Sequence, residues 1–310
     1  MPTYVMDDGC VFHTIKEALE GNLNSGDIYY YEKNISDIHS LVESEFEKKV
    51  YISDDYTNYH INDKYIYEHL SCSMDANLRD PFLLLFVTLE RLTKFDSELC
   101  INDSVFNIDE FFASSFIQGK LSGFITNRDV ATSAWWDSSL HRKLKCKNEA
   151  ADIFKDKLLS DGVNYQSIFE YKHIFWPNCY FHIGTTNRFS NLYVPEIQNL
   201  PILVRHLDFL DKEAKDLYNN YPVPDRFISE ASAKGIDLSP ESPSTRRNSA
   251  AMAQRKITIN GKEVLCEWHT KLQATAGRVH YCLNFSEPDE ISESVKGRVI
   301  IGIFTEHFDT

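Results

Sequence analysis

The sequence lacks the short motifs of several large enzyme classes. It has no P-loop, no GxGxxG fingerprint and no GxSxG elbow, so nucleotide-driven and α/β-hydrolase functions have no support. It also has no HExxH and no CxxC pair, the spacings typical of many zinc sites. Its seven cysteines are an odd number, which favours free thiols in a reducing compartment. We therefore expect no cofactor, no metal ion and a cytoplasmic location.

Long apolar segments are also missing. The strongest apolar run, Phe82 to Val87, lies between Asp80 and Glu90 and is far shorter than the about 20 residues of a membrane span. The first ten residues have no basic region ahead of an apolar one, so no targeting segment is predicted. We expect no membrane partner.

Acidic residues dominate, but only in part of the chain. The net charge is −14, from 32 basic and 46 acidic residues. The segment from Glu241 to Thr310 holds nine of each, so the whole negative excess lies in residues 1–240. A strongly acidic chain is unsuited to general binding of duplex DNA, because that binding requires phosphate neutralisation. The neutral C-terminal segment is the part that can approach a polyanion such as RNA.

The 310 residues are sufficient for two or three domains, and 13% aromatic residues exclude a disordered chain. We predict an α+β fold with a mixed α/β domain of unknown role (1–170), a helical middle with a connector (171–243) and a sheet domain (244–310). Local patterns predict helices over Thr14–Leu19, from Asp80, over Ile108–Ile117 and from Pro201, and strands over Ile28–Tyr31, Val50–Ile52 and Tyr171–Ile183.

The C-terminal segment has the clearest strand pattern. Asn260-Gly261 separates two strand-like runs, and this dipeptide is the strongest short-range signal of a hairpin. We expect a four-stranded antiparallel sheet packed on helices, with strands Lys256–Ile259, Lys262–Leu272, Arg278–Phe285 and Arg298–Phe304.

Alternation along these strands gathers ionisable side chains on one face of the sheet. Glu267, His269 and Lys271 share a face on one strand, and Arg278 and His280 share a face on the next. His269, His280 and Glu267 suit general acid–base catalysis near neutral pH, and Lys271 with Arg278 suits a phosphate group. The set suits cleavage of a phosphodiester by its own 2′-hydroxyl without a metal ion.

Two other interpretations of this face remain open. A solvated sheet face is normally polar, and opposite charges on neighbouring strands stabilise pairing by about 0.2–1 kcal/mol. His269, His280 and Glu267 also have the donor atoms for zinc, although no zinc motif supports that site.

The same strands resemble those of RelE/ParE-like toxin domains over about residues 244–310. The stretches that carry the resemblance are Thr258–Glu263, Trp268–Leu272, Gly277–Tyr281, Gly297–Phe304 and Glu306-His307. The resemblance implies an antiparallel sheet packed on short helices. It also implies one of two activities, metal-independent mRNA cleavage in RelE-type members or action on gyrase in ParE-type members.

Two functions follow from these expectations. The first is a bacterial toxin-like or antiphage effector, a metal-independent endoribonuclease. His269 or His280 would act as acid or base, Glu267 as orienting or basic group, and Lys271 with Arg278 would bind the phosphate. The second is a non-enzymatic interaction or adaptor protein of a defence or toxin–antitoxin system. RNA is the expected partner in the first case, and a protein partner is expected in both.

Overall fold

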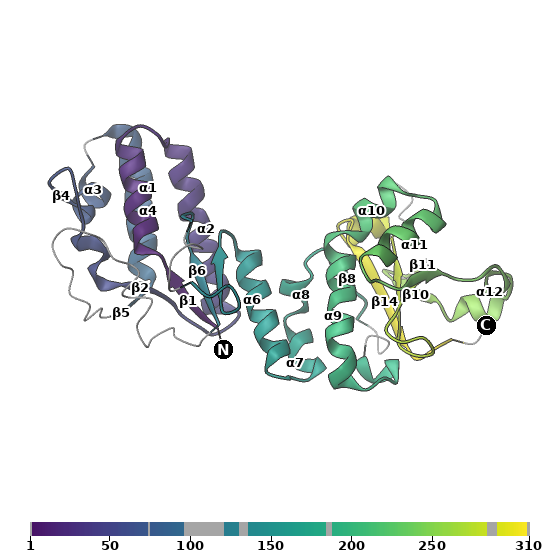
Figure 1. Cartoon of the computed structure of the whole chain (residues 1–310). Helices are drawn as coiled ribbons and strands as arrows, with labels where there is room; N and C mark the ends of the chain where they lie inside the picture. The colour runs from purple at the N-terminus through teal and green to yellow at the C-terminus, as the bar shows by residue number, and fades with distance from the viewer. Residues whose placement is uncertain are drawn as a thin grey trace. The chain divides into compact units, whose positions relative to one another are not determined.

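The computed structural model describes residues 2–73, 75–95, 121–129, 136–183, 188–283 and 290–308. The chain forms two compact units, Met1–Leu158 and Leu159–Thr310, which we call unit 1 and unit 2 (Figure 1). Three parts were predicted, with boundaries at 170 and 243. The helical segment and the C-terminal strands instead share one core, in which Trp268 packs edge-on against Tyr218 and Phe227.

Unit 1 contains a five-stranded sheet in which every strand is parallel to its neighbours. The strand order is β5-β2-β1-β6-β7, with β1 at the centre. The strands are β1 (Thr3–Met6), β2 (Val50–Ser53), β5 (Thr93–Phe95), β6 (Ser122–Ile125) and β7 (His141–Leu144). In this order the chain places β2 and β5 on one side of β1 and β6 and β7 on the other side. Open parallel sheets usually bind their ligands beside such a reversal, at the carboxyl ends of the strands.

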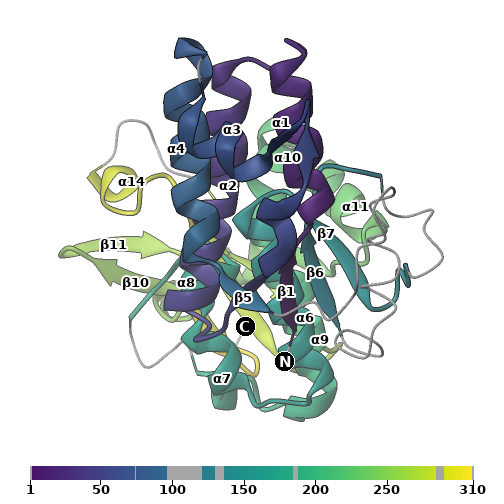
Figure 2. The ribbon, with the colours of Figure 1, turned by 90° about the vertical axis from the view of Figure 1, so that its left-hand side faces the viewer.

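Helices of unit 1 lie beside this sheet, and Figure 2 shows α1 to α4 next to one another. The helices are α1 (Asp8–Leu19), α2 (Ser25–Ser44), α3 (Ile66–Cys72), α4 (Ala76–Arg91) and α6 (Lys147–Ser160), with a 3₁₀ turn η1 (Asp54–Asn58) and a short hairpin of β3 (His60–Ile61) and β4 (Lys64–Tyr65).

The predicted strand over Ile28–Tyr31 is wrong, because this segment lies in α2. The Asn24 side chain accepts hydrogen bonds from two backbone N–H groups of the first turn, and Asp27 accepts one from the Asn24 N–H. This capping box starts a helix whatever the strand propensity of the residues that follow.

Two other predictions for unit 1 are confirmed. Val50–Ile52 lies in β2. The helix expected from Asp80 is part of α4, which begins earlier, after the capping residue Asp75. Phe82, Leu85 and Leu89 on this helix are buried in the core. The helix predicted over Ile108–Ile117 lies outside the described residues.

The main sheet of unit 2 is mixed, with the order β8-β14-β13-β12-β9. The strands are β8 (Cys179–Phe181), β9 (Leu238–Pro240), β12 (Trp268–Lys271), β13 (Arg278–Cys282) and β14 (Val299–Thr305). β8 is parallel to β14, and the other pairs are antiparallel. An α+β arrangement agrees with the prediction, but the predicted four-stranded antiparallel sheet is wrong.

The difference arises because the expected strand Lys262–Leu272 is interrupted at Cys266 and Glu267. Its first half is β11 (Lys262–Leu265), which pairs only with β10 (Lys256–Ile259) in a separate hairpin. The second half, β12, enters the main sheet, whose two edges come from strands outside the predicted sheet domain.

Both faces of the main sheet are covered. On one face Trp268 contacts the helical segment, as described above. On the other face the hairpin packs on β13 and β14, where Ile257, Val264 and Cys266 share an apolar cluster with Ile300 and Ile303. His280 lies directly opposite Ile303 in the ladder, so its side chain is on the covered face rather than in solvent.

Helices make up most of the rest of unit 2. The helix predicted from Pro201 is confirmed as part of α9, which begins at Glu196, and a second helix starts after Glu213. The segment Tyr171–Ile183 is only partly extended. The helices are α7 (Tyr165–Glu170), α8 (Lys172–Phe175), α9 (Glu196–Lys212), α10 (Ala214–Asn220), α11 (Pro224–Ala233), α12 (Pro243–Arg247), α13 (Ser249–Ala253) and α14 (Glu290–Ser294), with a 3₁₀ turn η2 (Phe189–Leu192). None of the helices in the described ranges combines the length and the apolar composition of a membrane span.

Candidate functional site

The register of β12 and β13 brings the two predicted histidines together. His269 lies opposite His280, and Lys271 lies opposite Arg278. Residues opposite each other on neighbouring strands have their side chains on the same face, so the expected grouping of these four residues is confirmed. The two imidazole ring centres are 5.0 Å apart.

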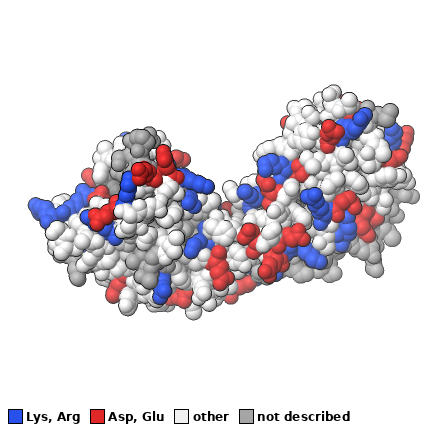
Figure 3. Space-filling model, turned by 180° about the vertical axis from the view of Figure 1, so that it is seen from behind, with Lys and Arg blue, Asp and Glu red and all other residues white. Residues whose placement is uncertain are grey.

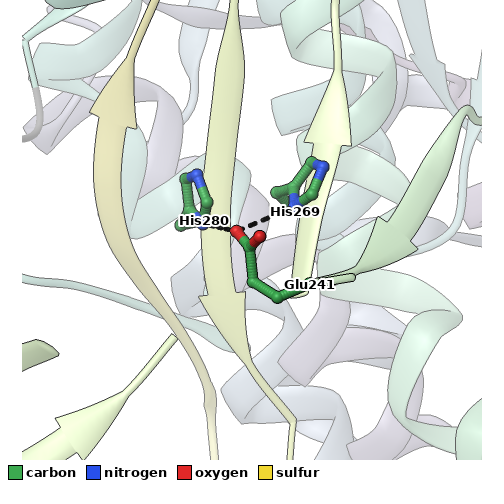
Figure 4. Close-up of side chains that lie close together, drawn as sticks. All are labelled: Glu241, His269 and His280. Carbon is green, nitrogen blue, oxygen red and sulfur yellow. Dashed lines mark ion pairs between the residues drawn. The ribbon is translucent and has the colours of Figure 1, made fainter. Parts of the chain in front are cut away.

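A carboxylate that the sequence did not indicate completes this group. β9 pairs with β12, and the Glu241 N–H donates to the carbonyl of Glu267. Glu241 Oε1 therefore lies 3.7 Å from His269 Nδ1 and 3.9 Å from His280 Nδ1 (Figure 4). One donor atom from each of the three side chains lies within 4.8 Å of the other two. We call Glu241, His269 and His280 the triad.

Arg255 holds the carboxylate of the triad in place. Its Nε donates to Glu241 Oε1 at 2.9 Å, and its Nη1 donates to the Ala251 carbonyl at 2.7 Å. The guanidinium also lies over the ring of Phe308, 4.7 Å from its centre. Arg255 and Glu241 are 2% and 6% exposed, so this is a buried ion pair, whose disruption would leave an isolated charge in the interior.

Each histidine has one ring nitrogen with a neighbour and one without. His280 Nδ1 lies 3.2 Å from the Cys266 carbonyl, and because a carbonyl only accepts, this contact places the proton on Nδ1. His269 Nε2 lies 3.3 Å from Ser239 Oγ. The other nitrogens, His280 Nε2 and His269 Nδ1, are buried and have no hydrogen-bond partner among the described residues.

Both imidazoles are neutral at pH 7. Burial is the main cause that lowers the pKa of His269, to about 3, and the nearby charges of Arg278, Lys271 and Arg255 act in the same direction. Burial also lowers the pKa of His280 well below its ordinary value, with His269 as the next cause. His280 is 1% exposed, whereas the side chain of His269 is 12% exposed, so the triad approaches the surface at His269.

The other predicted site residues have different surroundings. Glu267 is not part of the triad, because its carboxylate pairs with Arg246 at 3.1 Å. Lys271 is partly exposed and pairs with Asp237 at 3.1 Å. The buried guanidinium of Arg278 donates to three carbonyls of the Gln273–Ala276 loop. Arg278 therefore fixes the turn between β12 and β13 and is not available to a phosphate group.

Unit 1 has a polar cluster at the carboxyl ends of β1 and β6. Arg128 donates two hydrogen bonds to the Asp7 carboxylate, at 2.8 and 2.9 Å, and the Thr126 hydroxyl donates a third at 2.5 Å. Burial, and then the charge of Asp7, raise the pKa of the neighbouring Asp8 well above its ordinary value. Asp7 precedes the first turn of α1, and Asp8 is the first residue of this helix.

Comparison of the chain with protein-family models, with curated proteins and with solved structures finds no match. The functional argument therefore depends on the chemistry of the site alone.

Proposed function

We propose that unit 2 binds the phosphodiester backbone of RNA beside His269 and cleaves it, as a toxin-like or antiphage effector. The observation that carries the proposal is the charge around this histidine. Arg278, Lys271 and Arg255 lie close enough to lower its pKa, and of these Lys271 and Arg255 are paired with Asp237 and Glu241. The guanidinium of Arg278 donates to carbonyls, so a positive excess remains near an imidazole that reaches the surface of a chain with a net charge of −14. This excess favours an anionic ligand.

The positive environment is local rather than a broad basic surface. Acidic and basic side chains are interspersed on the face of the molecule drawn in Figure 3. Lys271, although paired with Asp237, is partly exposed beside His269. A single phosphate group at this point fits the charge distribution better than an extended nucleic-acid duplex does.

The proposed roles follow from exposure. His269 acts as the acid or base, because it is the histidine of the triad that reaches the surface. A phosphate bound among the cations offsets their charge and raises the pKa of His269 toward the range in which imidazole exchanges protons near neutral pH. Lys271 contacts the phosphate, and the fully buried His280 and Glu241 orient His269. Glu241 thus takes the orienting role that was expected of Glu267.

The test is cleavage of a fluorescently labelled single-stranded RNA by the full chain. We expect His269→Ala to reduce the cleavage rate by about 10²-fold or more, as loss of a general acid or base does. His13→Ala, which removes an exposed histidine in unit 1, is the matched control and should retain the rate. Circular dichroism at each step checks that the variants are folded. Equal rates for wild type and His269→Ala contradict the proposed role.

A second function, the non-enzymatic interaction protein, is supported by the burial of most of the site. His280, Arg278 and Arg255 are each less than 5% exposed, as expected of a polar network that fixes the shape of a binding unit. Under this alternative the folded wild-type chain leaves RNA intact, and Lys271→Met does not change its affinity for RNA. That pair of results would favour the interaction protein over the ribonuclease.

A further inference from the structure

The triad contains buried polar atoms that the protein itself does not satisfy. His269 Nδ1 and His280 Nε2 have no hydrogen-bond partner among the described residues, and both rings are at least 88% buried, with side-chain exposures of 12% and 1%. Buried polar atoms without a partner are rare in folded proteins and call for a ligand, an ion or a water molecule. The two rings belong to the same group as the Glu241 carboxylate, in which one donor atom from each side chain lies within 4.8 Å of the other two, so the group offers a set of donors for a cation.

The distances within the triad are close to those of a metal site. A tetrahedral ion with bonds of about 2.0–2.1 Å holds its ligand atoms roughly 3.4 Å apart. Glu241 Oε1 lies 3.7 Å from His269 Nδ1, which is too long for a hydrogen bond. On His280 the nitrogen 3.9 Å from Glu241 Oε1 is Nδ1, which faces the Cys266 carbonyl. Closing the triad around an ion therefore requires a rotation of the His280 side chain that presents Nε2.

We infer that Glu241, His269 and His280 bind a divalent transition-metal ion, and that this ion is Zn²⁺. Two imidazole nitrogens and one carboxylate oxygen are ligands that zinc accepts, whereas Mg²⁺ and Ca²⁺ require oxygen ligands. Three protein ligands leave one tetrahedral position for water, as in catalytic zinc sites. The inference goes beyond the function proposed above and replaces one role in it, because a zinc ion on His269 Nδ1 leaves that imidazole unable to act as the acid or base. Metal binding itself is measurable without RNA.

The surroundings of the triad resemble the outer contacts of a metal site. Metal-binding histidines usually direct their second nitrogen to a carbonyl, a carboxylate or water. Here the Cys266 carbonyl is next to His280 Nδ1, and the Ser239 hydroxyl is next to His269 Nε2. Arg255 holds Glu241 Oε1, so the position of the carboxylate is fixed before an ion arrives.

The neighbouring cations oppose the ion and set the expected strength of binding. Arg255 is compensated by Glu241 and Lys271 by Asp237, whereas Arg278 has only carbonyl partners in the structure. Replacing this charge should tighten metal binding if the loop keeps its shape. The inference thus predicts a site whose affinity is limited by local positive charge rather than by the donor atoms.

The experiment is a titration of the full chain with Zn²⁺ after dialysis against a chelator, in competition with a chromophoric zinc indicator. We expect one equivalent to bind to wild type, and at least about 100-fold weaker binding to His269→Ala and to Glu241→Gln. Glu267→Gln is the matched control, because this neighbouring carboxylate pairs with Arg246 outside the triad, and it should bind like wild type. Cobalt absorption spectra separate the triad from the thiols, since thiolate ligands add intense near-ultraviolet bands.

Two results would overturn the inference. One is the absence of saturable binding to folded wild type, and the other is equal binding by wild type and His269→Ala. His269 is the decisive position because it is the more exposed histidine of the triad, so its variant should fold even where Glu241→Gln does not. The inference and the proposed function can fail separately. One equivalent of zinc without RNA cleavage contradicts only the function, whereas RNA cleavage by a chain that binds no zinc contradicts only the metal site.

Discussion

Burial favours the neutral form of ionisable side chains in both units, but it raises the pKa of an acid in unit 1 and lowers the pKa of two histidines in unit 2. In unit 1 burial and the adjacent Asp7 raise the pKa of Asp8, which favours the neutral acid. In unit 2 burial and neighbouring cations lower the pKa of His269 and His280, which favours the neutral imidazole. Asp8 and the two histidines should therefore contribute to the acid response of their units with opposite signs, although they belong to one chain.

The Asp7 carboxylate and the triad also differ in how completely their polar atoms are satisfied. The loops after β1 and β6 supply Asp7 with three hydrogen bonds that involve both carboxylate oxygens. The triad of unit 2 lies in the middle of a sheet face, beneath a hairpin, and two of its nitrogens have no partner among the described residues. We conclude that the Asp7 cluster joins two strand ends, whereas the triad has the unused bonding capacity that a functional site requires.

The largest expected effect is on the buried ion pair of unit 2. Arg255→Met leaves Glu241 without its cation in the interior, and the free energy of unfolding of unit 2 should fall by about 3–5 kcal/mol. Hydrogen exchange measured by mass spectrometry reports the opening of each unit separately. Peptides of unit 1 should be unaffected, and a loss below about 1 kcal/mol in unit 2 would show that Glu241 reaches water in the folded protein.

Acidification is the next largest effect, and it distinguishes the two units directly. The native pKa values of His269 and His280 lie below the value of about 6.5 for a histidine in an unfolded chain. As the pH falls below this value, the unfolded chain therefore binds more protons than the folded chain does. Unit 2 should lose stability from about pH 6.5 downward toward the native pKa of about 3 for His269. Each histidine contributes up to about 1.4 kcal/mol per pH unit.

Urea unfolding at a series of pH values measures this slope. His269→Gln should reduce it by about a third, because His280 and the buried His206, whose pKa burial lowers to about 4, keep their proton-binding differences. Asp8 acts in the opposite sense in unit 1, since its native pKa is raised and protonation favours the folded state. Equal loss of stability by both units between pH 7 and pH 5 would contradict the comparison.

A smaller effect is expected for the Asp7 cluster. Asp7→Asn keeps the shape of the side chain but removes its charge and weakens both bonds to Arg128, so unit 1 should lose about 2 kcal/mol. The loss should be smaller than that of Arg255→Met, because Arg128 is partly exposed and its charge can return to water. If Asp7→Asn lowered the free energy of unfolding by more than Arg255→Met does, the Asp7–Arg128 pair would be the more stabilising of the two, which contradicts the proposed order.

The smallest expected effect is a gain. Asp8→Asn removes a carboxylate that Asp7 and Asp55 repel, so unit 1 should become more stable at pH 7 by about 1 kcal/mol. The gain should disappear at low pH, where the native carboxyl is protonated. Hydrogen exchange of unit 1 peptides at pH 7 measures it, and a loss of stability would mean that the Asp8 charge is compensated in the folded protein.

The local part of the candidate site could be predicted from the sequence. Alternation along two strands placed His269 with His280, and the ladder confirms this pairing. Glu241 and Arg255 could not be found in the same way. Glu241 lies in a segment rich in serine and proline that indicated a connector, and only the pairing of β9 with β12 brings it to the histidines. Nothing in the local sequence specifies that pairing.

The same distinction holds for the fold. β2 and α4 were predicted because their residues have clear local patterns. The parallel sheet of unit 1 was not, since β1 pairs with β6, more than 110 residues later in the chain, and no short-range signal marks such a pair. The strand predicted at Ile28–Tyr31 was wrong because aromatic and β-branched residues were weighed above the capping pair Asn24 and Asp27.

X-ray absorption at the zinc edge, on the full chain loaded with one equivalent of Zn²⁺, tests the central claim most directly. The account predicts a first shell of nitrogen and oxygen atoms at about 2.0–2.1 Å, with outer scattering from two imidazole rings that is lost in His269→Ala. A shell that contains sulfur at about 2.3 Å, or oxygen atoms without imidazole scattering, would contradict it.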